Sequence, residues 1–301
     1  YMAIKHLVLS GGGAKFGFYI FGILTYAIKN NMLNINDIES LYCTSAGSLI
    51  GPLLGLKLDI DTICDWLINR PWENVLNFDP DAIISGYTNG GILERSVVDN
   101  LYGNLLLSQD LSKDITLQEY YNYNNIEIHI QATALTNNDC YHTDFSYKTH
   151  PNTLLLDAIY MSSSIPIICK PIIKENIIYY DGGLWSNTPF SEWRNHYKDV
   201  DLKEVLIVQA VIGNENITFN AHNQNLFNLL MLLIRNYTRK NNSYNEEIEL
   251  APYKCLVDLS QENIGDFFDI LSDRNSRQQI INELSITHIA KAFSKFKTDC
   301  H

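Results

Sequence analysis

Short apolar runs that end at glycines or small polar residues mark the first strands of this chain. The run from His6 to Ser10 is almost continuously apolar and leads into three glycines. Such a run is typical of a strand buried on both faces, as in a parallel sheet. Apolar positions between Phe18 and Ile28 follow with helical spacing, and a second short strand is predicted over Leu41–Cys43. The order predicts a strand–helix–strand unit.

The same alternation continues along the chain. Helices are predicted over residues 46–56, with Pro52 in the first turns, and around 60–68, 93–102 and 154–161. Further strands are predicted at 126–134, 177–180 and 205–211. This alternation predicts an α/β fold with a mainly parallel central sheet. Beyond residue 212 we find helical patterns and polar connectors without another convincing strand. We therefore expect a core domain over 4–212 and a helical C-terminal extension packed on it over 213–301.

Composition narrows the classes of function. The 301 residues, 46% of them apolar, can bury one substantial core, and the formal net charge of -12 disfavours nucleic acid and anionic membrane surfaces as electrostatic partners. Six scattered cysteines and eight histidines without metal-ligand spacing disfavour a zinc site or a disulfide framework. We expect no metal and no cofactor. Without a signal-like start or an apolar run of about 20 residues, we expect a cytoplasmic protein that binds membranes at most peripherally.

Three consecutive glycines, Gly11, Gly12 and Gly13, leave the first strand and open the first helix. Their N–H groups can converge on an anion, with the helix dipole behind them. This geometry suits an oxyanion, a phosphate or a plain structural turn. A dinucleotide fingerprint would require glycine where Phe16 stands, and no P-loop Gly-Lys-Ser/Thr follows.

Ser45 lies in a Cys43-Thr44-Ser45-Ala46-Gly47 turn between the second strand and the next helix. A sharp strand-to-helix turn of small residues can lift a serine hydroxyl out of the sheet for nucleophilic attack, although Ser45 could also be an ordinary helix N-cap. Because adjacent parallel strands joined by a right-handed crossover end at the same sheet edge, Ser45 would face the glycine loop.

Asp181 ends a predicted apolar strand and precedes Gly182 and Gly183. In isolation it could be a turn aspartate. As a general base it would take the proton of Ser45 and then activate water. An ordinary aspartate pKa near 3.9 makes a weak base, so we expect partial burial to raise it.

At these three stretches the chain resembles the patatin-like phospholipases, whose glycine loop, serine elbow and Asp-Gly-Gly/Ala motif read here GGGAKFG, CTSAG and DGG. The segments Ser162–Pro166 and Asn187–Pro189 also match, so the resemblance spans roughly residues 4 to 212. It implies a three-layer α/β/α fold, a Ser45–Asp181 dyad without histidine and an oxyanion hole at Gly11, Gly12 and Gly13. It further implies calcium-independent hydrolysis of phospholipid acyl esters through an acyl-serine intermediate.

Other positions support the motifs or depart from them. Lys15 would position the loop or meet an anionic headgroup, or it is simply a solvated lysine at the start of a helix. Gly47, Gly182 and Gly183 complete the elbow and base motifs. Phe16 and Cys43 stand where the family has glycine.

Several alternatives remain open at this stage. One is a non-catalytic lipid- or phosphate-binding module of the same fold, and another is a neutral-glyceride or general esterase. A histidine-dependent esterase would need a histidine after the acid, and the candidates are His196, His222, His288 and His301. The apolar run Leu226–Ile234 could enter a bilayer surface or pack in the core. The expected partner is a phospholipid or membrane-surface substrate.

Overall fold

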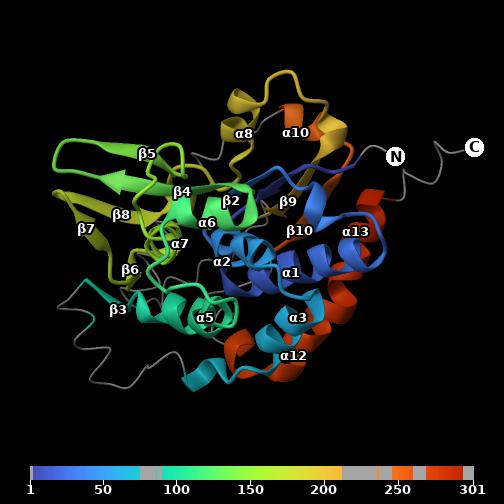
Figure 1. Ribbon diagram of the computed structural model, residues 1–301, viewed down its shortest axis with the longest axis horizontal. Coiled ribbons are helices and arrows are strands. Elements are labelled where there is room, and N and C mark those ends of the chain that lie inside the picture. The colour runs from blue at the N-terminus through green and yellow to red at the C-terminus, as the bar shows by residue number, and fades with distance from the viewer. Residues whose placement is uncertain are drawn as a thin grey trace, which may run out of the picture.

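The chain is built on one eight-stranded sheet (Figure 1). The computed structural model describes residues 3–74, 86, 90–211, 236, 246–259 and 269–293. The strand order is β10-β9-β1-β2-β4-β8-β7, with β5 also paired to β4. The strands are β1 (His6–Leu9), β2 (Ser40–Thr44), β4 (Glu127–Leu135), β5 (Cys140–Phe145), β7 (Ile172–Lys174), β8 (Ile177–Asp181), β9 (Val205–Val211) and β10 (Lys254–Asp258). A separate parallel pair joins β3 (Gly91–Leu93) to β6 (Ile167–Cys169).

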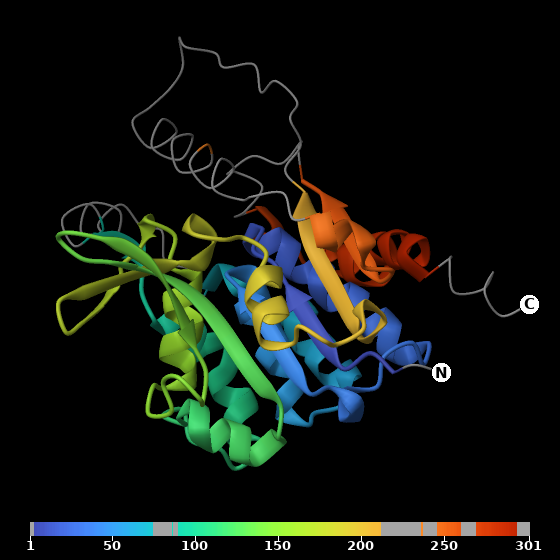
Figure 2. The same ribbon diagram turned by 90° about the horizontal axis from the view of Figure 1, so that it is seen from above.

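The centre of the sheet is parallel. β10, β9, β1, β2 and β4 all run in one direction, whereas β5, β8 and β7 are antiparallel to their neighbours. β4 and β5 form a long hairpin (Figure 2, green). The predicted α/β fold with a mainly parallel sheet is therefore confirmed. β1 and β2 are direct neighbours, with Leu9 beside Cys43, as the crossover argument requires.

Helices cover the two faces of the sheet unequally. Alternate strand residues such as Leu7 and Leu41 enter the larger core, while Val8 and Tyr42 enter a smaller one on the opposite face. The larger core contains α1 (Gly13–Lys29), α2 (Ala46–Ile50), α3 (Ile60–Asn69), α5 (Ser96–Leu107), α6 (Leu117–Asn124), α7 (Leu155–Ser163) and α13 (Ser285–Phe293). The smaller contains α8 (Phe190–His196) and α10 (Glu246–Leu250), which lie above the sheet in Figure 1.

The C-terminal helices pack closely on α1 and α3. A Cβ atom added at Gly22 of α1 would lie 2.7 Å from Ser285 Cβ and 2.8 Å from the carbonyl oxygen of Ile281, so this crossing has room only for glycine. Arg277 of α12 (Arg274–Gln279) is buried, and its guanidinium donates to the carbonyl oxygen of Ile68 at the end of α3. These contacts tie the helices over residues 274–293 to α1 and α3.

Two sequence predictions are corrected. The helix predicted over 46–56 ends at Ile50 and continues as a 3-10 helix over Gly51–Leu56, because Pro52 lacks the N–H that an α-helix needs. The prediction that no strand follows residue 212 is wrong, because β10 adds a parallel strand beside β9. β10 lies at the edge of the sheet, where Lys254, Leu256 and Asp258 are not buried, so it lacks the continuous apolar run of the central strands. The domain division at residue 212 stays a prediction.

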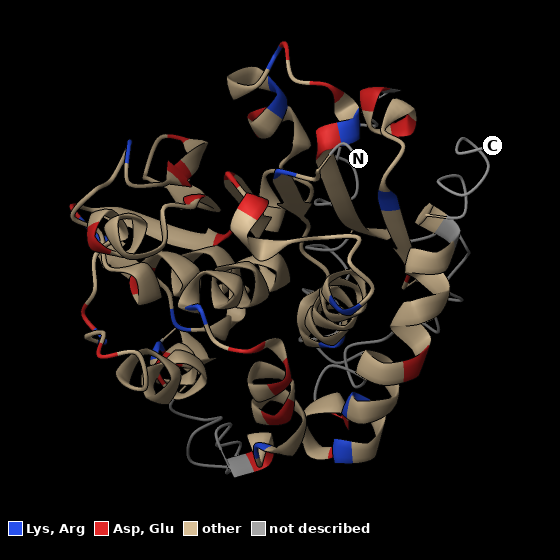
Figure 3. Cartoon of the chain, turned by 45° about the vertical axis from the view of Figure 1, so that its right-hand side comes forward, with Lys and Arg blue, Asp and Glu red and all other residues tan. Residues whose placement is uncertain are grey.

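Charged residues are scattered over many helices and loops in the view of Figure 3. In the described ranges, none of the helices is long and apolar enough to cross a membrane. The apolar run 226–234 lies outside those ranges.

Candidate active site

Ser45 occupies a strained turn between β2 and α2. Its backbone has φ 51° and ψ −116°, a left-handed φ that costs a non-glycine residue free energy. Gly47 makes the turn possible: its N–H donates to the carbonyl oxygen of Ser10 at 3.2 Å, and a Cβ there would overlap the carbonyl group of Leu9. The end of β1 and the serine turn are therefore in backbone contact.

Asp181 lies directly beside Ser45. The Ser45 hydroxyl donates to Asp181 Oδ2 at 2.5 Å, and Asp181 Oδ1 accepts the N–H of Gly183 at 2.7 Å. Sheet register explains the meeting, because β4 carries Gln131 opposite Thr44 of β2 and Ala132 opposite Asp181 of β8. The antiparallel strand β8 thus ends level with the end of β2. The next residue, Gly182, presses against the carbonyl group of Gln131.

Burial changes the acidity of Asp181. The residue is 7% exposed, and desolvation raises its pKa to about 6, against the opposing effect of the hydrogen bonds from Ser45 and Gly183. Removing water disfavours the charged carboxylate, so the group holds a proton more tightly than a surface aspartate does. At neutral pH the carboxylate is still mainly ionised, and it is a stronger base than usual.

The glycine loop lies against the same serine. A Cβ at Gly11 would lie 3.0 Å from Ser45 Cβ, and the Gly11 N–H donates to the carbonyl oxygen of Asn187 at 2.9 Å. The Asn187 side chain returns a hydrogen bond to the Gly11 carbonyl oxygen at 3.0 Å. The Gly11 amide is thus occupied in holding the loop.

The amides of Gly12 and Gly13 differ from that of Gly11. Gly13 has φ 80° and begins α1, where N–H groups have no partner within the helix. Among the described residues, neither amide has a hydrogen-bond acceptor. An anion next to Ser45 would find its donors here. Lys15 lies half-buried in the first turn of the same helix.

Phe16 and Cys43, the two departures from the family motif, are both accommodated by nearby glycines. Phe16 is fully buried, and its ring lies where a Cβ at Gly12 would come within 2.6 Å. The Cys43 Sγ lies 2.6 Å from the position of a Cβ at Gly51, and burial raises the pKa of this thiol. The Phe16 and Cys43 side chains therefore fill space that is free because Gly12 and Gly51 have no side chains.

The segment Ser162–Pro166, which matches the family in sequence, contacts both Ser45 and Asp181. The Ser45 N–H donates to Ser162 Oγ at 3.0 Å, and the Asp181 N–H donates to the Ser164 carbonyl oxygen at 2.8 Å. Thr133 adds a hydrogen bond from Oγ1 to the Asp181 carbonyl oxygen at 2.9 Å. The run of serines before a proline was the signal for these roles.

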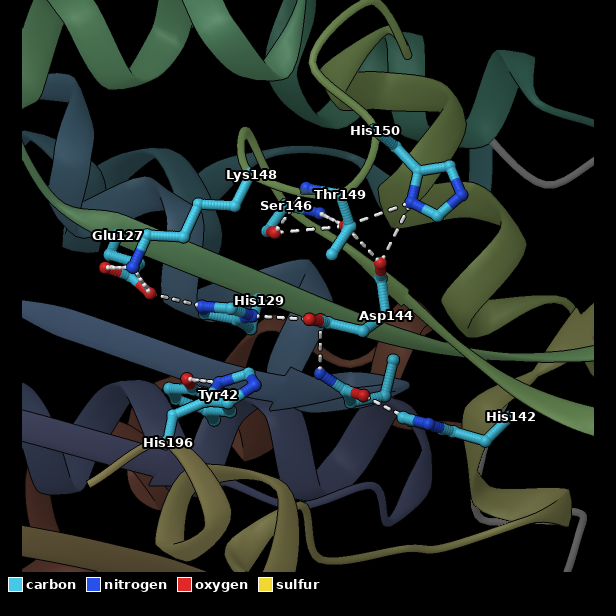
Figure 4. A network of polar contacts seen from close by, with 11 residues as sticks. Tyr42, Glu127, His129, His142, Asp144, Ser146, Lys148, Thr149, His150 and His196 are labelled. Carbon is cyan, nitrogen blue, oxygen red and sulfur yellow. Dashed lines mark hydrogen bonds and ion pairs between the residues drawn. The ribbon is translucent and has the colours of Figure 1, made fainter. Parts of the chain in front are cut away.

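Several histidines instead belong to a second polar network, which gathers around Asp144 and His129 (Figure 4). His196 bonds the Tyr42 hydroxyl at 2.5 Å, and His288 bonds the Leu256 carbonyl oxygen at 2.9 Å. Within the described ranges, no histidine is hydrogen-bonded to Ser45 or Asp181. His222 and His301 lie outside those ranges.

Comparison with known proteins identifies the family. A sequence model described as patatin-like phospholipase matches residues 7–192. The chain belongs to the patatin-like phospholipase family. A probable lipid hydrolase of Invertebrate iridescent virus 6 is 28% identical over 224 residues, which cover 74% of this chain and 73% of that protein. An uncharacterized protein of Acanthamoeba polyphaga mimivirus is also 28% identical, over 74% of this chain and 67% of that protein.

Solved structures include more distant neighbours of this patatin-like chain. VipD from Legionella pneumophila aligns with a TM-score of 0.45 and 14% identity, over 94% of this chain and 67% of VipD. The type III effector ExoU aligns with a TM-score of 0.49 and 11% identity, over 98% of this chain. The patatin-like chain spans 53% of the ExoU chain.

Proposed function

We propose that this patatin-like protein is a phospholipase A-type hydrolase that cleaves the fatty-acyl esters of phospholipids. The observation that carries the proposal is the hydrogen bond of 2.5 Å between Ser45 Oγ, on its strained turn, and the buried carboxylate of Asp181. Family membership supports lipid esters as the substrate class. Acyl transfer requires a nucleophile, a base and a set of hydrogen-bond donors for the oxyanion. The amides of Gly12 and Gly13 supply these donors.

In the first half-reaction, Ser45 Oγ attacks the ester carbonyl carbon while its proton passes to Asp181 Oδ2. The carbonyl oxygen becomes negatively charged and accepts hydrogen bonds from the Gly12 and Gly13 amides. When the tetrahedral intermediate collapses, the ester C–O bond breaks, and the leaving alcohol takes the proton from Asp181. The products are a lysophospholipid and acyl-Ser45.

In the second half-reaction, the Asp181 carboxylate accepts a proton from a water molecule that attacks acyl-Ser45. Collapse returns that proton to Ser45 Oγ and releases the fatty acid. The raised pKa of Asp181, about 6, suits a base that is ionised at neutral pH. Because every proton transfer is assigned to Ser45, Asp181 and water, we propose that hydrolysis requires no histidine. Because the Gly12 and Gly13 amides stabilise the oxyanion, we propose that it requires no calcium either.

The test is release of free fatty acid from mixed phospholipid vesicles, with and without a calcium chelator. Ser45→Ala should lower chelator-resistant release at least about a thousandfold, because the nucleophile is gone. Ser108→Ala, at the end of α5, is the matched control and should keep the wild-type rate. Appreciable release by folded Ser45→Ala would refute the assignment.

Parallel measurements separate the alternatives. Faster hydrolysis of a neutral-glyceride emulsion than of vesicles would reassign the substrate. Abolition of turnover by alanine at His196, His222, His288 or His301 would favour a histidine-dependent esterase. A folded wild type that neither releases fatty acid nor reacts with a fluorophosphonate at Ser45 would favour a non-catalytic lipid-binding module.

A further inference from the structure

The last turn of α7 brings a hydroxyl group against the backbone of the proposed nucleophile. Ser162 is fully buried. Its Oγ lies 3.0 Å from the Ser45 nitrogen, 2.7 Å from Ser48 Oγ and 2.5 Å from the Gln131 carbonyl oxygen. These three contacts come from the serine turn, from α2 and from β4.

The three hydrogen bonds of the Ser162 hydroxyl can be assigned a donor and an acceptor each. A serine hydroxyl has one hydrogen to donate and two lone pairs to accept. The Gln131 carbonyl can only accept, so it receives the Ser162 hydrogen, and the Ser45 N–H can only donate. The remaining lone pair must accept the hydrogen of Ser48 Oγ. Ser162 is therefore saturated and held in one orientation.

This arrangement settles the direction of the Ser45 amide. The backbone of Ser45 has a costly left-handed φ of 51°, which persists only where the surroundings hold it. With its N–H bound to Ser162, the residue cannot relax without leaving a buried donor unpaired. Because the Ser45 N–H is already donated to Ser162, it does not serve as an oxyanion donor.

The same turn also holds the proposed base. The Ser164 carbonyl oxygen accepts the Asp181 N–H at 2.8 Å, and the Ser164 hydroxyl is anchored to the Tyr160 carbonyl oxygen at 2.7 Å. Ser45 is thus bonded to Ser162, and Asp181 is bonded to Ser164, two positions further along the same buried helix end. The spacing of that helix end fixes the spacing of the two reacting groups.

We propose that Ser162 is a positioning residue of this hydrolase, whose hydroxyl fixes the Ser45 backbone and thereby the distance from Ser45 Oγ to Asp181. Ser162 touches no reacting atom, and it acts through Ser45. This inference rests on the proposed function. It assigns to the first serine of the Ser162–Ser164 run a different task from that of its neighbour, because the Ser163 hydroxyl donates to the Ile159 carbonyl oxygen of its own helix.

Kinetics on a soluble acyl ester test the inference first. Ser162→Ala should lower kcat by about 10- to 100-fold with KM changed by less than about twofold, because a misplaced nucleophile slows chemistry without altering substrate contacts. Ser163→Ala, the matched control, should keep the wild-type kcat. Ser162→Cys retains a weak acceptor in nearly the same volume, so its kcat should lie between those of wild type and Ser162→Ala.

Two kinetic outcomes would overturn the role. One is a wild-type kcat in folded Ser162→Ala, and the other is an equal loss in Ser163→Ala. If Ser162→Ala does not fold, Ser162→Cys carries the test, and a kcat equal to that of wild type would then contradict the inference.

Crystal structures give a readout that does not depend on turnover. In Ser162→Ala the distance from Ser45 Oγ to Asp181 Oδ2 should lengthen beyond about 3.0 Å, the upper end of the range for O–H···O hydrogen bonds, while Ser163→Ala should keep the short bond. An unchanged distance in Ser162→Ala would refute the positioning role. A wild type that is neither active nor labelled by a fluorophosphonate would refute the proposed function, and the crystallographic distances would still decide the role of Ser162.

Discussion

At the scale of single residues, the burial of Asp181 matters more than its position in a motif. An aspartate at the surface would be a poor base for a serine hydroxyl, whereas desolvation raises the pKa of Asp181 to about 6. Its partner Ser45 is held on a turn that only small neighbours allow. The chemistry of both residues therefore depends on the groups packed around them.

The raised pKa predicts an acid limb in the rate profile. Only the ionised carboxylate can accept the Ser45 proton, so kcat/KM should rise with pH and reach half its plateau near pH 6. The measurement is hydrolysis of a soluble acyl ester across this range, with circular dichroism to confirm folding. Asp181→Asn should lose most turnover at every pH. A rate that is flat between about pH 5 and 8 would contradict the assignment of Asp181 as base.

At the scale of elements, an ion triad joins β4 to β5. The His129 ring is buried, with Nδ1 2.6 Å from Asp144 Oδ2 and Nε2 2.7 Å from Glu127 Oε1 (Figure 4). Carboxylates accept hydrogen bonds, so both ring nitrogens must carry hydrogen, and the imidazole is a cation. Tyr42 stacks on the ring at 4.2 Å between centroids, and Lys148 also donates to the Glu127 carboxylate.

The pKa values of His129 and Glu127 agree with this assignment. Burial lowers the pKa of His129, but the hydrogen bonds to Asp144 and Glu127 together raise it by more than burial lowers it. The pKa therefore lies above the ordinary 6.5. Burial raises the pKa of Glu127, whereas its bonds to His129 and Lys148 lower it to about 2. The histidine proton therefore contributes stability that is complete below about pH 6.5 and lost as the pH rises through the folded-state pKa.

His129→Gln should therefore destabilise the protein and flatten this part of its pH dependence. Removing one partner of a buried ion pair costs about 3–5 kcal/mol, because the remaining charges stay buried without compensation. The free energy of unfolding in urea, measured at about pH 6 and about pH 9, should differ less in the variant than in wild type. His288→Gln, whose ring bonds a backbone carbonyl at the surface, is the control. An equal pH dependence in wild type and His129→Gln would contradict the ion triad.

At the scale of the whole molecule, the C-terminal helices complete the helical layer on the face of the sheet that carries the larger core. They pack on α1 where Gly22 meets Ile281 and Ser285, and Arg277 binds the end of α3. The helix that leaves the glycine loop is thus covered by the described helices over residues 274–293. Stability of the site and docking of the C-terminal helices should depend on each other.

Gly22→Ala tests this docking. The added methyl would lie 2.8 Å from the backbone oxygen of Ile281, so the helices must move apart, at a cost of about 1–3 kcal/mol. Gly17→Ala on the same helix is the matched control. Its Cβ would make ordinary contacts at 3.5 Å with Ile50, and alanine favours helix. Unfolding in urea measures both variants, and an equal stability of the two would contradict the close crossing.

Much of the sheet could be predicted from the sequence because strand burial and helix spacing are local patterns. β1, β2, β8 and β9 were anticipated within a residue or two. β5, β7 and β10 were not. β7 and β10 are short strands at the two edges of the sheet that are not buried on both faces, and β5 alternates polar residues that the buried network pairs. Periodicity within one segment does not report which strand will lie beside it.

The sequence by itself determined which residues could carry chemistry, since Gly13, Gly47 and the serine turn follow from backbone sterics within a few positions. Only the tertiary structure decided how they are used. The register of β4 and β8 placed Asp181 against Ser45, and burial raised the pKa of Asp181. Packing also paired the Gly11 N–H with the Asn187 carbonyl oxygen and the Ser45 N–H with the Ser162 hydroxyl. Pairing between distant segments and exclusion of water depend on the packing of the whole chain, which no local pattern contains.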